Sequence, residues 1–331
     1  MADSETQTPE TQPSLTDFSG ALAAAAERAA ASLVAIDARP RVATSGVVWR
    51  ENVIVSTNHT IRRDEDIRVL LADNTTHEAR LIGRDAGTDL AVLKLSDETI
   101  GQTLKAADIG DAADLKVGNI VLALGRTGAE RQGTSASLGI INRVGDAWKT
   151  WRGDQIDRLI ALDARIYLGF SGGALVGANG KIYGVNTSAF GRGTALTIPA
   201  ETINRVVEQI LKNGKVSKPF LGIGTQPVPL PNNLREKFNL EQTNGLIMLM
   251  VEPDAPADKG GILIGDILLA LEDRSTTDLG DVQTVLAGKS AGQIVRAKLL
   301  RGGELIEKEI TLGERPAREQ RGRGRGFGRR R

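Results

Sequence analysis

The sequence predicts a mainly β protein of two or three domains. Its 331 residues exceed the usual length of one domain. From Leu33 to about Ile198, short apolar runs alternate with Gly, Asp and Asn, a pattern typical of β-barrels or β-sandwiches. Aromatic residues make up only 3% of the chain, whereas 40% of the residues are hydrophobic, so we expect aliphatic cores.

The N-terminal segment 1–19 is polar and contains two prolines, which predicts disorder. Residues 20–32 are rich in alanine, and we expect a short helix packed on the body there. We see no basic stretch before an apolar core and no run long enough to span a membrane. These observations favour a cytoplasmic location, with the cell envelope as the alternative.

The region 33–198 divides into two similar halves that meet near Asp108–Asp111. One amphipathic helix, Ala200–Lys212, follows, with Gly214 as its stop signal. The clearest predicted strands are Ser45–Trp49, Val53–Thr57, Ile67–Leu71, Leu90–Leu95, Ile120–Leu124 and Ile182–Thr187.

Three short motifs predict chemistry at the ends of these strands. Ser171 lies in the run Gly169-Phe-Ser-Gly-Gly173, where glycines bring backbone amides close to a bound group. His59 ends the strand Val53–Thr57, and Asp89 precedes the strand Leu90–Leu95. Nucleophilic serine needs a base and a carboxylate that fixes the tautomer of that base. Each residue could instead be structural: a strand end, a turn acid or a turn hydroxyl.

The three runs resemble the motifs of trypsin-like serine proteases of the HtrA/Deg type. They read Ser56-Thr-Asn-His-Thr60, Thr88-Asp-Leu-Ala-Val92 and Gly169-Phe-Ser-Gly-Gly173, in the family's order. The resemblance covers Leu33–Asn213 and includes Ala195-Leu-Thr-Ile-Pro199. It implies two six-stranded, chymotrypsin-like β-barrels with the catalytic residues in the cleft between them.

The resemblance also implies the roles of the site residues. His59 would be the general base, Asp89 its orienter and Ser171 the nucleophile, with the amides of Gly169 and Ser171 as the oxyanion hole. The sequence departs from the family pattern at Tyr167 and Phe170, where relatives have asparagines. The hydrogen bonds that brace the oxyanion loop are therefore expected to differ.

The substrate-binding residues implied by the resemblance are Ile166, Gly184, Val185 and Asn186. Ile166 would favour a small or medium aliphatic side chain before the scissile bond. Arg165 would favour an acidic side chain, or block the pocket, if it pointed inward, although a solvent-facing arginine is the commoner case. The strand 184–188 would pair with an extended or unfolded substrate chain.

The region 214–313 resembles a PDZ domain, a small β-barrel with helices. Its backbone at Phe220, Leu221, Gly222 and Ile223 would bind a peptide C-terminus. Val282 and Leu286 either line the peptide pocket or belong to the core, and the sequence leaves these alternatives open.

The terminal segment 314–331 is predicted to be a disordered Arg/Gly-rich tail. Residues 315–331 contain eight arginines and one glutamate, a net charge of +7, which leaves −6 for the rest of a chain whose total is +1. The body is therefore not a general nucleic-acid binder. The tail favours weak anionic or RNA contacts, and RNA binding as the main function is a third interpretation.

The sequence therefore predicts four regions: segment 1–19, a protease domain at 20–213, a PDZ domain at 214–313 and the tail. It indicates a serine endopeptidase that cleaves unfolded or extended polypeptides in protein quality control, and family members suggest a homotrimer. The alternative is an inactive or weakly active peptide-binding scaffold. The triad requires no cofactor. A chain with no cysteine and only two histidines, His59 and His77, excludes thiol chemistry and a multi-histidine metal cluster.

Overall fold

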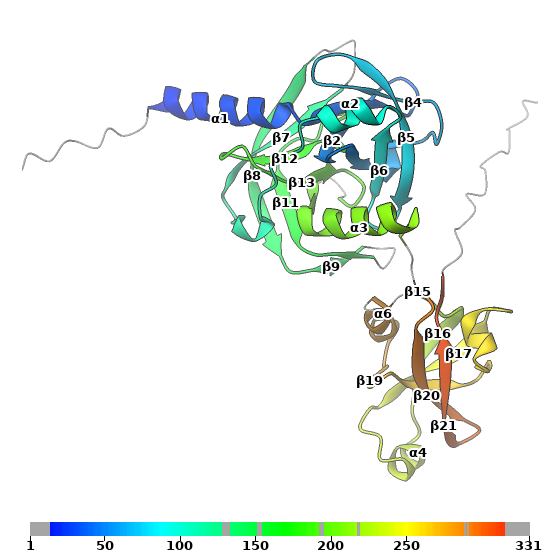
Figure 1. The fold of residues 1–331 in the computed structure, drawn as a ribbon. Helices are drawn as coiled ribbons and strands as arrows, with labels where there is room; N and C mark the ends of the chain where they lie inside the picture. Colours follow the sequence, from blue (N-terminus) through cyan, green and yellow to red (C-terminus); the bar gives the residue numbers. More distant parts are fainter. Residues whose placement is uncertain are drawn as a thin grey trace, which may run out of the picture. The chain divides into compact units, whose positions relative to one another are not determined.

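The structure is a computed structural model that describes residues 14–127, 133–150, 154–191, 195–216, 219–287, 289 and 291–314. The chain forms two compact units, Met1–Val216 and Ser217–Arg331 (Figure 1). The division falls just after the predicted helix and its Gly214 stop. The predicted tail, apart from Glu314, lies outside the described residues.

The first unit contains two closed six-stranded barrels, which confirms the predicted fold. In the first barrel the strand order is β1-β2-β3-β6-β5-β4, and pairing of β1 with β4 closes it. Its strands are β1 (Leu33–Asp37), β2 (Thr44–Arg50), β3 (Val53–Thr57), β4 (Ile67–Leu70), β5 (Thr76–Asp85) and β6 (Leu90–Leu95).

In the second barrel the order is β11-β14-β13-β12-β7-β8, and pairing of β11 with β8 closes it. Its strands are β7 (Ile120–Arg126), β8 (Thr134–Gly145), β11 (Leu159–Asp163), β12 (Ala174–Gly177), β13 (Ile182–Thr187) and β14 (Ala195–Pro199). A separate two-stranded sheet consists of β9 (Trp148–Lys149) and β10 (Gln155–Ile156).

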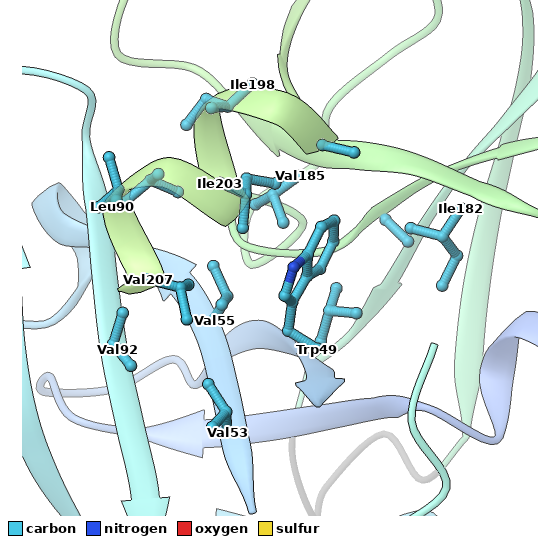
Figure 2. Close-up of a cluster of buried hydrophobic side chains, with 14 of the residues drawn as sticks. Trp49, Val53, Val55, Leu90, Val92, Ile182, Val185, Ile198, Ile203 and Val207 are labelled. Carbon is cyan, nitrogen blue, oxygen red and sulfur yellow. The ribbon is translucent and has the colours of Figure 1, made fainter. Parts of the chain in front are cut away.

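Helix α3 (Ala200–Asn213) contacts strands of both barrels and closes the space between them. The cluster beneath it combines residues of α3 with residues of both barrels, and Figure 2 shows ten labelled members. Trp49 on β2 donates a 2.8 Å hydrogen bond from Nε1 to Oδ1 of Asn204 on α3. Because each fully buried aliphatic side chain contributes about 1.5–3 kcal/mol, this shared core fixes one barrel against the other.

Helix α1 (Leu15–Ala30) begins earlier than the sequence predicted. Residues 15–19 were expected to be disordered, but Ser14 and Asp17 form a capping box in which each side chain binds the other residue's backbone amide. Such a cap satisfies amides that would otherwise lack partners and stabilises the first turn. Ala25 and Ala29 are buried against the body, as expected. Residues 1–13 lie outside the described part of the chain.

The remaining helical segments of this unit are α2 (Glu98–Thr103) and two short 3₁₀ turns, η1 (Asn58–Thr60) and η2 (Ala112–Asp114). Among the helices that the structure describes, none combines the length and apolar character needed to cross a membrane.

The second unit is a six-stranded sheet in which β16-β17-β18-β20-β21 lie in that order and β19 pairs with β18. Strand β16 pairs only with β17 among the described residues, so its other edge is open. The elements are β15 (Pro219–Phe220), β16 (Ile223–Pro229), α4 (Asn232–Lys237), β17 (Asn244–Val251), α5 (Pro256–Lys259), β18 (Ile267–Leu271), β19 (Arg274–Ser275), α6 (Leu279–Ala287), β20 (Ile294–Arg301), β21 (Glu304–Thr311) and β22 (Gly313–Glu314).

One ion pair in this unit is nearly inaccessible to solvent on its acidic side. Arg301 donates from Nε and Nη2 to the two carboxylate oxygens of Asp266, each at 2.7 Å, and the amide of Leu263 donates to Asp266 at 2.8 Å. Burial acts to raise the pKa of Asp266, but the hydrogen bonds from Arg301 and Leu263 outweigh it and hold that pKa below its ordinary value.

Candidate active site

His59 and Asp89 meet because the strands that precede and follow them are paired. Strand β3 ends in the turn that carries His59, Asp89 immediately precedes β6, and Thr57 pairs with Leu90. The Nδ1 atom of His59 lies 2.8 Å from Oδ2 of Asp89, and the amide of His59 donates to Oδ1 at 2.9 Å. A carboxylate accepts only a protonated Nδ1, so this contact leaves the Nε2 lone pair of neutral His59 available as a base.

Asp89 is buried and held by donors from both barrels. Thr187, at the end of β13, donates from its hydroxyl to Oδ2 of Asp89 at 2.7 Å. Asp89 also has a positive φ of 60°, and its backbone carbonyl accepts a 2.9 Å hydrogen bond from the amide of Asn58. Three donors satisfy this buried carboxylate and fix its position. The sequence analysis missed Thr187, whose only signal was a hydroxyl at a strand end.

Ser171 lies in the loop between β11 and β12, and the first barrel holds this loop. The Thr44 hydroxyl donates to the carbonyl of Ser171 at 2.6 Å. The amide and the hydroxyl of Ser45 donate to the carbonyl of Gly169, at 3.0 and 2.7 Å. Gly172 has a φ of 89°, and a Cβ there would collide with the Ser45 carbonyl. Neither Thr44 nor Ser45 was predicted as a site residue.

The amides of Gly169 and Ser171 are the donors expected to form the oxyanion hole. Within the described ranges, neither N–H has a hydrogen-bond acceptor. Gly169 has a φ of 96°, a conformation that favours glycine, and its carbonyl is turned to Ser45. Two unpaired amides at the serine are what stabilisation of a developing oxyanion requires.

The hydroxyl of Ser188 lies between the serine and the histidine. Its Oγ is 3.1 Å from Oγ of Ser171 and 3.4 Å from Nε2 of His59. Among the described residues, these are the hydrogen-bond contacts of the Ser171 hydroxyl and of Nε2. The structure thus brings all three predicted triad residues together, with a fourth side chain interposed. The sequence analysis included Ser188 in the substrate-pairing strand 184–188 but did not predict its contact with the triad.

Tyr167 and Phe170, the two aromatic residues at positions where relatives have asparagines, hold the serine loop in place by packing. Phe170 is 3% exposed and belongs to the core of the second barrel. Its ring packs against Gly125, where a Cβ would lie only 2.7 Å from it, and meets the Tyr167 ring edge-on at 5.4 Å. Arg165 is exposed and stacks over Tyr167 at 5.8 Å, so the inward-pointing alternative does not hold.

The predicted substrate edge at Gly184, Val185 and Asn186 is contradicted by the barrel pairing. Strand β13 lies between β12 and β14, and these residues pair on both sides. Asn186 is fully buried, and its amide side chain binds Ala174 and Thr197. A closed barrel has no free edge for a substrate there. The exposed residues directly after the strand are Ser188 and Ala189.

Ile166 is partly buried against the core of the second barrel, on the segment that leads to Ser171. This packing does not test whether Ile166 contacts the substrate side chain, so that contact stays a prediction. His77, expected at the surface, lies on β5, with Nε2 2.8 Å from the Thr75 hydroxyl.

In the second unit, the predicted peptide-binding run directly precedes and enters the open edge strand. Gly222 has a φ of 80°, and its carbonyl accepts from the amide of Glu252 at 2.8 Å. Leu221 is buried in the core, Ile223 is partly buried beside it, and Phe220 is half-buried on β15. Of the two residues left open, Val282 is a core residue, whereas Leu286 is only partly buried.

Comparisons with known proteins agree with this architecture. Residues 44–185 match the model of the trypsin-like peptidase domain, and residues 219–312 match that of the PDZ domain. The "Probable periplasmic serine endoprotease DegP-like" of Rickettsia conorii is 34% identical over 274 residues, which cover 81% of this chain and 53% of the relative. The "Serine protease Do-like HtrA" of Lactobacillus helveticus is 30% identical over 283 residues, which cover 81% of this chain and 68% of the relative.

A solved structure described as "HtrA-type protease AlgW with decapeptide" superposes with a TM-score of 0.71 at 27% identity, covering 89% of this chain and 99% of that one. The chain belongs to the HtrA family of serine proteases, and the resemblance seen in the sequence is confirmed. It spans about half the length of the first curated relatives that it matches.

The expected cytoplasmic location is wrong. Several relatives are named as periplasmic serine endoproteases, which points to the cell envelope. The expectation rested on seeing no export signal in the N-terminal segment.

Proposed function

We propose that this protein is a serine endopeptidase in which His59, Asp89 and Ser171 form the catalytic triad. The observation that carries the proposal is the 2.8 Å contact between Nδ1 of His59 and Oδ2 of Asp89, beside a serine with two unpaired amides. Membership of a protease family supports it.

The geometry supports the following sequence of steps. Ser171 Oγ attacks the scissile carbonyl carbon while Nε2 of His59 takes its proton, and the carbonyl oxygen becomes an oxyanion bound by the amides of Gly169 and Ser171. His59 then protonates the leaving amine as the C–N bond breaks. Water, deprotonated by His59, hydrolyses the acyl-enzyme and restores the Ser171 hydroxyl. Asp89 accepts from Nδ1 of His59 throughout and stabilises the imidazolium.

The substrate class we propose is an unfolded or extended polypeptide, as expected of a protease in protein quality control. An extended chain would pair with the exposed backbone after β13, at Ser188 and Ala189, since β13 itself has no free edge. Ile166 would contact the side chain before the scissile bond. A folded protein cannot present such an extended segment without local unfolding.

The PDZ unit is proposed to bind peptide C-termini. A peptide would add to the open edge of β16 and place its carboxylate at the backbone of Phe220, Leu221, Gly222 and Ile223. Leu286 is proposed to contact the terminal side chain, because it is only partly buried on α6, an element that contacts β16. The related protease AlgW has been solved with a decapeptide.

Labelling with a fluorophosphonate probe and digestion of unfolded casein test the protease proposal. Wild-type protein should be labelled and should digest casein, and Ser171→Ala should do neither. Ser135→Ala, which removes an exposed hydroxyl on β8, is the matched control. An unlabelled wild type, with or without a PDZ-binding peptide, would leave the peptide-binding scaffold as the function.

A titration with peptides that end in an apolar residue tests the PDZ proposal. Gly222→Ala should abolish binding, because a Cβ at this positive φ would collide with Ala255. Blocking the peptide carboxylate as an amide should have the same effect on the wild type. Equal affinity for the amidated peptide would contradict C-terminal recognition.

Two further proposals concern assembly and the tail. A homotrimer is proposed from the family, and α1 offers exposed apolar residues, Leu15 and Phe18, for a contact between copies. Light scattering on the wild type and on Leu15→Glu tests it. Weak anionic or RNA contacts are proposed for residues 315–331 from their net charge of +7. A gel shift that survives deletion of these residues would refute this.

A further inference from the structure

The Ser188 hydroxyl lies between the hydroxyl of Ser171 and the ring of His59. It bridges Ser171 and His59, at 3.1 Å from Oγ and 3.4 Å from Nε2, and these two atoms share no direct hydrogen bond. With Nδ1 of His59 donating to Asp89, Nε2 is an acceptor. Ser188, which has one hydroxyl proton, therefore donates to Nε2 and accepts from Ser171.

The lengths of these contacts indicate a weak bridge. Hydroxyl hydrogen bonds usually measure about 2.5–3.0 Å, so both contacts are long. Ser188 is exposed, and it directly follows Thr187, whose hydroxyl is committed to Asp89 at 2.7 Å. The backbone at Ser188 is thus anchored at the triad, while its side chain can rotate away at little cost.

We propose that Ser188 is a positioning residue that acts as a catch. In the unliganded site it holds the Ser171 hydroxyl away from Nε2 of His59, and an extended substrate that pairs with the backbone after β13 displaces it. Ser171 then donates directly to His59. The inference rests on the proposed protease function and adds a substrate-dependent alignment of the triad to it.

The test compares Ser188→Ala with Ser188→Thr by the rate of fluorophosphonate labelling. In this reaction the Oγ–P bond forms, fluoride leaves and His59 accepts the Ser171 proton. The small probe does not cover the segment after β13, so it reacts with the catch in place. Since one net hydrogen bond corresponds to a factor of about two to ten, Ser188→Ala should be labelled about two- to tenfold faster than wild type. Ser188→Thr keeps the hydroxyl and should retain the slow rate.

Comparing the effect of Ser188→Ala on a long peptide with its effect on the small probe separates a catch from a merely structural role. Saturating unfolded polypeptide displaces the Ser188 hydroxyl in the wild type, so the rate of Ser188→Ala relative to wild type should be lower for kcat on a long peptide than for labelling by the small probe. The melting temperature should not change, because Ser188 is exposed. Ser135→Ala controls for loss of an exposed hydroxyl elsewhere.

The other outcomes overturn the inference in distinguishable ways. Slower labelling of Ser188→Ala would make Ser188 a proton relay, and equal labelling would deny it any role at the triad. In both cases wild-type labelling still supports the protease. If neither wild type nor Ser188→Ala is labelled, the proposed function fails and the catch fails with it. Labelling of Ser188→Ala alone would support the catch.

Discussion

The hydroxyl of Thr44, on the first barrel, donates a 2.6 Å hydrogen bond to the carbonyl oxygen of Ser171, on a loop of the second. Thr44 is fully buried, so water cannot replace it. Together with the two bonds from Ser45 to Gly169, this contact makes the position of the nucleophile depend on both barrels.

Thr44→Val should therefore lower activity without removing the fold. The substitution preserves the shape of the side chain but leaves the buried Ser171 carbonyl without this donor, at a cost of about 1–3 kcal/mol. We expect kcat on a fluorogenic peptide to fall about tenfold, because a cost of 1.4 kcal/mol in alignment corresponds to that factor. Thr44→Ser should stay within about twofold of wild type; an equal loss in both variants would disprove the role of the hydroxyl.

Asp89→Asn should abolish most activity while preserving the fold. Asparagine tolerates the positive φ of 60° at this position, so the backbone need not change. Its single oxygen cannot replace both carboxylate oxygens, which accept from the His59 amide on one side and from Nδ1 of His59 and Thr187 on the other, and the His59 tautomer is no longer fixed. We expect kcat to fall by about 10⁴. Peptide turnover and a thermal melt check this, and a loss below tenfold would place Asp89 outside the catalytic machinery.

Phe170→Ala should destabilise the first unit and disorder the serine loop. The ring is 3% exposed and contributes to the core of the second barrel, so its removal should cost about 3–5 kcal/mol. Chemical denaturation followed by Trp fluorescence measures this cost. Phe170→Leu retains most of the packing and should keep measurable labelling by the fluorophosphonate. Comparable stability of Phe170→Ala and wild type would show that the aromatic brace is dispensable.

Asp266 should make the PDZ unit sensitive to acid. Because the pKa of the folded-state carboxyl lies below its ordinary value of about 3.9, the ion pair contributes its full stability above that pH. The contribution is lost as the pH falls from about 4 through the lower folded pKa. Asp266→Asn should cost on the order of 3 kcal/mol at pH 7 and progressively less below pH ~4.

Calorimetry of the full chain at pH 7 and pH 3 checks the Asp266 prediction. Glu307→Gln, which changes an exposed carboxyl on the same sheet, is the control and should melt like the wild type at both values. A destabilisation by Asp266→Asn that is as large at pH 3 as at pH 7 would contradict the assignment.

The sequence predicted what local patterns encode. Strand Val53–Thr57 matches its predicted bounds because turn residues flank a run rich in β-branched side chains, and the helix that begins at Ala200 follows from its apolar face and the Gly214 stop. His59, Asp89 and Ser171 were found because each lies within a motif. The structure places these three side chains near one another, and their catalytic roles stay predictions.

The remaining features depend on contacts between distant parts of the chain. Thr44 and Ser188 are single hydroxyls without a motif, and only the packing of two barrels brings them to Ser171. Gly184–Asn186 was expected to pair with substrate because no local pattern shows that β12 and β14 occupy both sides of this strand. The early start of α1 was missed because the Ser14 cap lies within a polar, proline-containing segment.

The open strand β16 contains Pro227 and Pro229, and these prolines limit the length of peptide that can pair with the PDZ unit. Proline has no amide hydrogen, so beyond Gln226 this edge loses two of its donors. A partner strand finds unbroken donors along only the first few residues of the edge. A short chain end satisfies that length, whereas a long internal strand does not, and the same two prolines discourage one copy of the sheet from joining another.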